Sequence, residues 1–393
     1  MQDVVIVSAA RTPLGLYMGS LADQRSQDLA AHSMKEAMAR AGFDSAEIDI
    51  CIYSEAKQSS FPANVGRHGW LLAGLSEDAG GFTMNTLCGG AIQTMVSGFN
   101  KIAAGEYQAI MAGGIETNSQ AQYYLVHPRY KLGPDNLCFH DSKVDVEINA
   151  QPSSIYGELS SARIADTIAF NNGLNRMAID EYAYGSRERA ITAIKNGVMK
   201  EAIAPVTKKV KKAEVLVDND QGAQLESVDK LLVKPAIYQG GTATDGNTAP
   251  LADGSASLIM LSADKAAKLG VQPLGKIAGF GIAAGNPQLL DKTSAKSIQK
   301  ALQMAGVTLE EVDFIDYHEP SAAYGLSLAR LLGDASQKAN VDGGSLGFGH
   351  AGAATGGALV VNMLYRLQRT GGTYGLVNVG ALGGQALSIV VKN

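Results

Sequence analysis

Asn85-Thr86-Leu87-Cys88-Gly89-Gly90 joins a short apolar run to a predicted helix that begins at Ala91. A strand, a tight turn and a helix in succession are the repeating unit of an α/β fold. A thiol at a helix N-terminus faces unpaired backbone N–H groups and the positive end of the helix dipole, which favour the thiolate. The two glycines let a substrate carbonyl approach the backbone closely. We therefore interpret Cys88 as a nucleophile and not as a small core residue.

Apolar, β-rich runs alternate with helical patterns along the whole chain. In the first part, the patterns predict strands near residues 3–8, 50–55, 108–113 and 256–262, and helices near 27–41 and 91–104. The last part repeats this order, with strands near 275–282, 312–317, 373–379 and 386–392, and helices near 295–305, 320–332 and 354–369. The shared order predicts a structural duplication, with one half over residues 1–270 and the other over 271–393.

A long insertion, about residues 114–255, interrupts the first half. It contains a predicted helix near 176–196 and the basic stretch Lys208-Lys209-Val210-Lys211-Lys212. Insertions of this length in a compact domain usually bind or cover a ligand, so we expect it to cover the site. The basic stretch is either a solvated face or a contact for a phosphate group.

The turn before helix 354–369 corresponds to the turn that carries Cys88, and it contains His350. If the two halves pack about a pseudo-twofold axis, the N-termini of the two helices converge. The Cys88 thiol then meets an imidazole, which is the side chain best suited to accept a proton near neutral pH.

Composition excludes several classes of protein. The 393 residues are 46% hydrophobic and carry a formal charge of −5, which argues against a nucleic-acid partner. Three cysteines without regular spacing predict neither disulfides nor a cysteine-based metal site, and the isolated His68, His127 and His140 predict no metal site either. The chain has no signal-like N-terminus and no apolar run near the ~20 residues that span a bilayer, so we expect a cytoplasmic protein with no membrane contact.

Five blocks of sequence, in order and nearly end to end, resemble the thiolase family. They are Val5-Ile6-Val7-Ser8-Ala9-Ala10-Arg11-Thr12-Pro13, Asn85-Thr86-Leu87-Cys88, Gly113-Gly114-Ile115-Glu116-Thr117-Asn118-Ser119, Asp245-Gly246-Asn247-Thr248-Ala249-Pro250-Leu251-Ala252-Asp253-Gly254-Ser255-Ala256, and Gly343-Gly344-Ser345-Leu346-Gly347-Phe348-Gly349-His350. Five ordered blocks are far more specific than any single glycine-rich match.

The resemblance implies a five-layered α-β-α-β-α fold built from two duplicated halves, with an inserted loop domain. It also implies an acyltransferase that takes a coenzyme A thioester as substrate, has no permanently bound cofactor, and forms a homodimer or homotetramer. In such an enzyme Cys88 attacks an acyl-CoA carbonyl and holds the acyl group as a thioester, and His350 takes the thiol proton.

Two positions depart from the family pattern. Most thiolases have Asn-Glu-Ala-Phe-Ala where this chain has His318-Glu319-Pro320-Ser321-Ala322. Because an imidazole N–H can donate to an oxyanion as an amide does, we expect His318 to be functional. Gly380 stands where the family has a second cysteine, which moves a proton at the substrate carbon, and glycine cannot do so. Candidates to replace this acid/base are His318, Glu319 and Cys138.

Other residues are candidates for substrate contacts. Tyr156 falls where the family lines its acyl pocket, and Ala249, Lys208 and Lys209 are the remaining binding candidates.

Three functions remain open from the sequence. The leading hypothesis is a thiolase-type acyltransferase acting on acetyl-CoA or 3-ketoacyl-CoA. The missing second cysteine also fits a non-catalytic or partner-dependent subunit. Finally, Cys88, His318 and His350 resemble the Cys-His-His set of ketoacyl synthases, which condense a malonyl thioester with loss of carbon dioxide and need no second cysteine.

Overall fold

A computed structural model describes residues 2–126 and 138–393, so residues 127–137 of the insertion, His127 among them, lie outside the described part. Within that part, one mixed ten-stranded sheet runs through both halves in the order β4-β3-β5-β10-β1-β11-β14-β13-β12, with β2 paired to β10. The N-terminal half supplies β1 (Val4–Arg11), β2 (Gly15–Leu16), β3 (Ile50–Ser54), β4 (Gly80–Met84), β5 (Ala109–Thr117) and β10 (Ala252–Ser262). The C-terminal half supplies β11 (Gly275–Ala284), β12 (Phe314–Tyr317), β13 (Tyr374–Ala381) and β14 (Gln385–Lys392).

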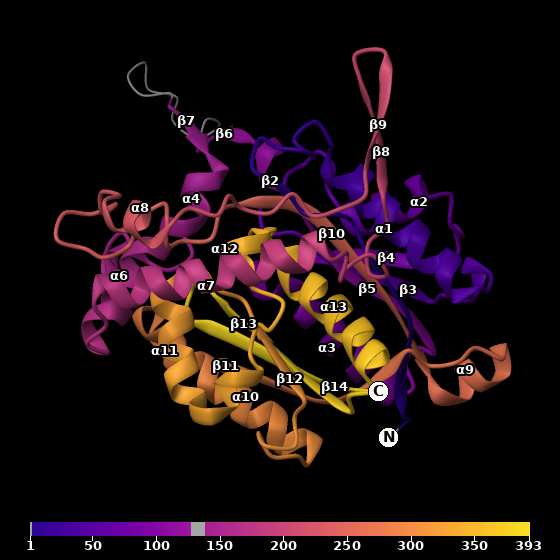
Figure 1. Ribbon diagram of the computed structural model, residues 1–393. Helices are drawn as coiled ribbons and strands as arrows, with labels where there is room; N and C mark the ends of the chain where they lie inside the picture. The colour runs from indigo at the N-terminus through magenta and orange to yellow at the C-terminus, as the bar shows by residue number, and fades with distance from the viewer. Residues whose placement is uncertain (1, 127–137) are drawn as a thin grey trace.

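The two blocks of strands meet where β1 pairs with β11, and the sheet folds around a central pair of helices (Figure 1). These are α3 (Gly90–Ala103) and α13 (Thr355–Thr370), which contact each other and strands of both blocks. The outer face of the N-terminal block carries α1 (Ser26–Ala41) and α2 (Val65–Leu72), and the outer face of the C-terminal block carries α10 (Leu290–Ala305) and α11 (Ala322–Leu332). The layers therefore follow the predicted α-β-α-β-α order.

The hydrophobic core follows the same layers. Between the two blocks, Ile92 and Met95 of α3 and Val360 of α13 pack against strand residues of both halves, such as Leu258 and Ile389. Separate clusters bury α1 and α2 on one outer face and α10 and α11 on the other. The central helices are therefore apolar on more than one face, as a helix between two sheets must be.

The insertion folds over the end of the sheet at which Cys88 lies. It comprises β6 (Tyr123–Leu125), β7 (Phe139–Asp141), α4 (Ser142–Ile148), α5 (Ser153–Tyr156), α6 (Ser161–Asn171), α7 (Arg176–Lys195), β8 (Val206–Val210), β9 (Ala213–Val217) and α8 (Val228–Leu232). The β8–β9 hairpin projects away from the rest of the molecule (Figure 1).

Most predicted elements lie within a few residues of their observed bounds, and the short helices α9 (Ala263–Leu269) and α12 (Ser345–Phe348) complete the set. The sequence patterns missed the β8–β9 hairpin, the short strands β2, β6 and β7, and the helices α2, α4, α5, α6, α8, α9 and α12. Among residues 2–126 and 138–393, none of the helices has the length and apolar character needed to cross a bilayer.

Candidate active site

Cys88 lies on a sharp turn at the end of β4. The Asn85 side chain shapes this turn: its Oδ1 accepts a hydrogen bond from the Leu87 N–H (2.9 Å), and its Nδ2 donates to the Ala56 carbonyl (2.9 Å). Leu87 has φ of 52°, in the left-handed region that a branched side chain seldom adopts. Residues Leu87–Gly89 then form a single 3-10 turn, and α3 begins at Gly90. Cys88 therefore lies directly before the N-terminus of α3.

Gly89 and Gly90 serve helix packing. A Cβ atom at Gly89 would collide with the Leu387 side chain, and one at Gly90 would collide with that of Ser54. These glycines therefore let α3 lie directly against β14 and β3, and their expected role in admitting a substrate carbonyl remains a prediction.

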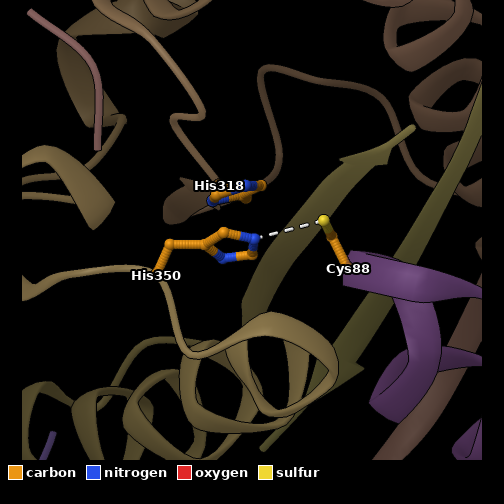
Figure 2. Close-up of side chains that lie close together, drawn as sticks. All are labelled: Cys88, His318 and His350. Carbon is orange, nitrogen blue, oxygen red and sulfur yellow. Dashed lines mark hydrogen bonds between the residues drawn. The ribbon is translucent and has the colours of Figure 1, made fainter. Parts of the chain in front are cut away.

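His350 and Cys88 come from the two halves of the chain and meet in one site (Figure 2). Cys88 Sγ lies 3.2 Å from His350 Nε2, and His350 Nδ1 lies 2.8 Å from Thr355 Oγ1 on the first turn of α13. Backbone bonds to the start of β10 fix the histidine: its N–H donates to Pro250 (2.7 Å), and its carbonyl accepts from Ala252 (2.8 Å). When His350 Nδ1 donates to Thr355, Nε2 is free to accept the thiol proton.

His318 follows β12 and stacks on His350, with ring centroids 4.1 Å apart (Figure 2). Its Nδ1 lies 2.8 Å from Ser345 Oγ, while its fully buried Nε2 has no hydrogen-bond partner among the described residues. When the Ser345 hydroxyl donates to Nδ1, Nε2 carries the hydrogen. In this tautomer, Nε2 is a buried N–H donor that an oxygen atom from outside the chain can satisfy.

The three side chains could also be considered as metal ligands, since their ligating atoms all lie within 4.8 Å of one another. A metal ion needs lone pairs that converge on one point. The two imidazole rings are stacked with only 27° between their planes, so their lone pairs run nearly side by side. This geometry suits hydrogen bonds to a substrate better than coordination.

Burial keeps the Cys88–His350 pair uncharged. Loss of water contact raises the pKa of the Cys88 thiol to about 11, although the charge of Lys57 and the Leu382 backbone amide both oppose the rise. Burial, aided by His318 and Lys57, holds the pKa of His350 well below its usual range, and burial alone lowers the pKa of His318 to about 3. Desolvation thus opposes the predicted thiolate in the free site and acts against the helix dipole.

A pocket of about 380 Å³ opens onto this site. Its floor includes Cys88, His318 and His350, and the insertion covers it through α4, the start of α6 and the segment around Tyr238. Ala249 lines the pocket as expected, beside Thr248 and Leu251. The insertion therefore forms one side of the pocket.

Gly380 also lines this pocket, and the wall behind it is closed to any side chain. A Cβ atom here would lie 2.8 Å from Tyr324 Oη, 3.0 Å from Leu290 Cγ and 3.1 Å from Ser294 Oγ. The Tyr324 hydroxyl is itself held by Ser294 Oγ at 2.6 Å and Asn378 Oδ1 at 3.2 Å. The place of the family's second cysteine is thus occupied by a buried hydroxyl network.

Two candidates for acid/base or support, Glu319 and Cys138, do not line the pocket. The Glu319 carboxylate faces away from the pocket and accepts hydrogen bonds from Tyr182, Ser186, Asn340 and the Leu346 N–H, so it braces the His318 loop and cannot reach a substrate. Cys138 is exposed beside β7 and does not line the pocket.

Three binding candidates lie elsewhere as well. Tyr156 ends the short helix α5 and lines a separate cavity with Arg163 and Gln288. Lys208 and Lys209 belong to the projecting hairpin and do not line the pocket, and Lys208 pairs with Asp23 at 3.0 Å.

The sequence patterns missed two residues at the site, Lys57 and Leu382, both of which line the pocket. Each lies in a loop that follows or joins strands, so no periodicity marks it. A lysine directly after a fully buried strand, in Ser54-Glu55-Ala56-Lys57, is the only signal that could have drawn attention to the first.

Models of two protein domains match the chain: "Thiolase, N-terminal domain" over residues 4–264 and "Thiolase, C-terminal domain" over residues 271–393. The chain belongs to the thiolase family. This thiolase is accordingly an acyltransferase that acts on acyl-CoA thioesters.

Relatives of known name align with the thiolase from end to end. It is 33% identical over 397 residues to an acetyl-CoA acetyltransferase of Escherichia coli, covering 100% of this chain and 99% of that protein. Among solved structures, the Bacillus anthracis acetyl-CoA acetyltransferase superposes with a TM-score of 0.95 at 29% identity, covering 100% and 99% of the two chains. Human mitochondrial 3-ketoacyl-CoA thiolase in complex with CoA gives a TM-score of 0.92 at 28% identity, covering 100% and 98%.

Proposed function

We propose that this thiolase transfers acyl groups through a covalent acyl-Cys88 intermediate. The observation that carries the proposal is the 3.2 Å contact between Cys88 Sγ and His350 Nε2 at the floor of the pocket. Cys88 Sγ forms a bond to the acyl carbon as its proton passes to His350 Nε2. The bond from that carbon to the CoA sulfur then breaks, and the leaving thiolate takes the proton from His350.

The pKa values of Cys88 and His350 indicate when the proton passes from the thiol to the imidazole. Burial raises the pKa of the Cys88 thiol to about 11 and holds the pKa of His350 well below its usual range. An ion pair is therefore disfavoured before the substrate arrives, so proton transfer accompanies attack on the carbonyl. The positive imidazolium then forms next to the developing oxyanion, where it is stabilised.

His318 is the proposed oxyanion donor. The His318 side chain lines the pocket beside His350, and its buried Nε2 has no hydrogen-bond partner among the described residues. A thioester oxygen placed against it satisfies this buried donor, and the hydrogen bond strengthens as negative charge develops. Loss of one such donor costs on the order of 3 kcal/mol in the transition state.

We propose acetyl-CoA and 3-ketoacyl-CoA as substrates by analogy with the names of the relatives. The CoA arm is expected to pass between the insertion and the loop that contains Thr248 and Ala249, because both line the covered side of the pocket. A wholly non-catalytic subunit is disfavoured, since the groups needed for acylation are all present.

Decarboxylative condensation is the second candidate for the carbon–carbon step. The position of Gly380 supplies no thiol to move a proton at the substrate carbon. His350, in contact with Cys88 Sγ, and His318, stacked on His350, are the candidates to carry that proton. Loss of carbon dioxide from a malonyl thioester generates the carbanion without a base. In ordinary thiolase chemistry, one of these histidines must instead carry that proton.

Two assays separate these outcomes. The intact mass of the protein after incubation with acetyl-CoA tests acylation, with Cys88→Ala as the control. Incubation of the acylated protein with acetyl-CoA or malonyl-CoA then identifies the extender. A ketoacyl-CoA product from acetyl-CoA supports the thiolase reaction, and one formed only with release of carbon dioxide supports the second candidate. An unmodified wild-type protein with every acyl-CoA contradicts the proposal.

A further inference from the structure

Lys57 places a cation inside the catalytic pocket. It follows β3 at the end of the buried strand, and its side chain is only 8% exposed. The ammonium is close enough to Cys88 and His350 to lower the pKa of both. A lysine at this depth is costly unless it is paired, so its partners need to be identified.

The protein itself satisfies this ammonium only in part. Within residues 2–126 and 138–393, the recorded ion-pair contact of Lys57 Nζ is Glu116 Oε1 at 3.7 Å, which is longer than a hydrogen bond. Glu116 is already engaged by three backbone N–H groups, those of Ala56 and Lys57 (3.1 Å each) and Ala353 (3.0 Å). Three N–H donors of the ammonium thus have no hydrogen-bond acceptor among the described residues.

A second cavity, of about 160 Å³, lies on the other side of Lys57 and shares this residue with the catalytic pocket. Polar side chains line most of it, namely Ser26, Glu55, Ser59, Glu116, Thr117, Gln120 and Gln122. An unbranched apolar acyl chain gains little from such walls. A polar chain end that reaches Lys57 gains hydrogen bonds there.

We propose that the acyl group carried by Cys88 ends in a carboxylate and that Lys57 binds this carboxylate. The inference rests on the proposed acyl-Cys88 intermediate and specifies its substrate class as ω-carboxyacyl-CoA thioesters. The carboxylate accepts hydrogen bonds from the ammonium donors that Glu116 leaves unused. Lys57 then selects the far end of the chain while Cys88, His318 and His350 act on the thioester.

The charges around Lys57 are compatible with this role. Burial and the charge of Glu116 raise the pKa of Glu55 to about 8, although the charge of Lys57 opposes the rise, so this carboxyl carries less negative charge at pH 7 than an ordinary glutamate. Glu147 lines the pocket from α4, but its Oε2 accepts a hydrogen bond from the Ser161 N–H on the covering side. The second lysine of the pocket, Lys143, points toward Tyr17, with Nζ 5.3 Å from the ring centre.

The test compares Cys88 acylation by dicarboxylic and monocarboxylic acyl-CoA pairs of equal carbon number: succinyl with butyryl, glutaryl with pentanoyl, and adipyl with hexanoyl. Rates are followed by intact mass at limiting substrate in the wild type, Lys57→Met, Lys57→Arg and the matched control Lys143→Met. The ratio within each pair cancels any effect of Lys57 on the reactivity of the thiol itself.

We expect the wild type to prefer at least one dicarboxylic member, and Lys57→Met to reduce that preference by about tenfold or more, the value of a charge-assisted hydrogen bond. Lys57→Arg retains much of the preference, and Lys143→Met leaves the ratio unchanged.

Equal ratios in the wild type and Lys57→Met overturn the proposal even when acylation proceeds normally, because Lys57 then only pairs with Glu116. A dependence on Lys57 seen solely in malonyl-CoA decarboxylation also overturns it, because the carboxylate then belongs to the extender. Failure of every acyl-CoA to modify Cys88 is a different result and contradicts the proposed function.

Discussion

Gly380→Ala tests whether the position of the second cysteine is truly closed. The new Cβ would lie 2.8 Å from Tyr324 Oη, 3.0 Å from Leu290 Cγ and 3.1 Å from Ser294 Oγ, whereas ordinary contacts begin near 3.4 Å. Leu290 is only 2% exposed and Tyr324 is hydrogen-bonded at both sides, so neither can move freely. Overpacking of this kind typically costs about 1–3 kcal/mol of folding free energy.

The assay is urea unfolding of the wild type, Gly380→Ala, Tyr324→Phe and the double variant. Tyr324→Phe removes the closest contact and by itself costs about 1 kcal/mol through lost hydrogen bonds. The double variant should therefore be more stable than the sum of the single effects by at least about 0.5 kcal/mol. Gly80→Ala is the control, because a Cβ there meets nothing closer than 3.7 Å. The reasoning is refuted if Gly380→Ala is as stable as Gly80→Ala and shows no coupling to Tyr324.

Three further predictions concern the charges and donors of the site. Because burial raises the pKa of Glu55 to about 8, the folded protein retains a proton that the unfolded chain releases. Glu55 should therefore lower the free energy of unfolding by about 3 kcal/mol between pH 5 and pH 8. Urea unfolding should show a smaller fall in Glu55→Gln than in the wild type, and an identical fall contradicts the raised pKa. Since burial raises the pKa of Cys88 to about 11, its alkylation by iodoacetamide should still accelerate above pH 9, and a plateau at or below the ordinary thiol pKa of 9.0 contradicts this raised pKa. His318→Ala should slow Cys88 acylation by about 10²–10³-fold with little change in substrate affinity, measured by single-turnover release of CoA, and a change confined to affinity is inconsistent with an oxyanion donor.

The meeting of Cys88 and His350 could be predicted from the sequence because both residues occupy the same place in a repeated unit. Each precedes a helix of the central layer, and a duplicated fold brings those helix N-termini together. The layers could also be predicted from the sequence. The apolar residues that give the helices and strands their periodic patterns are the same residues that pack in the core.

The protonation state of Cys88 could not be predicted in this way. A helix dipole contributes about 0.3–1 kcal/mol at an exposed site. The rise in pKa from the ordinary 9.0 to about 11 corresponds to about 3 kcal/mol in the opposite direction, and it depends on how much of the chain covers the thiol. Only the three-dimensional arrangement of the insertion and the β13–β14 turn reveals that cover.

Loop residues were the least predictable part of the site. Tyr156 and Lys208 were expected at the pocket, yet Tyr156 lines a separate cavity and a projecting hairpin carries Lys208. Lys57 and Leu382 reach the pocket from loops without a periodic pattern. The identity of the reaction follows from the central helices, whereas its selectivity depends on these loops.

The central claim is that Cys88 carries the acyl group. The most direct measurement is mass-spectrometric mapping of the acyl group after incubation with acetyl-CoA and rapid acid quenching, in the wild type and in His350→Ala. We predict a thioester on the peptide that contains Cys88, formed about 10²–10⁴-fold more slowly without the histidine base. An acyl group on another residue, or equal rates of Cys88 acylation in the two proteins, would contradict the account.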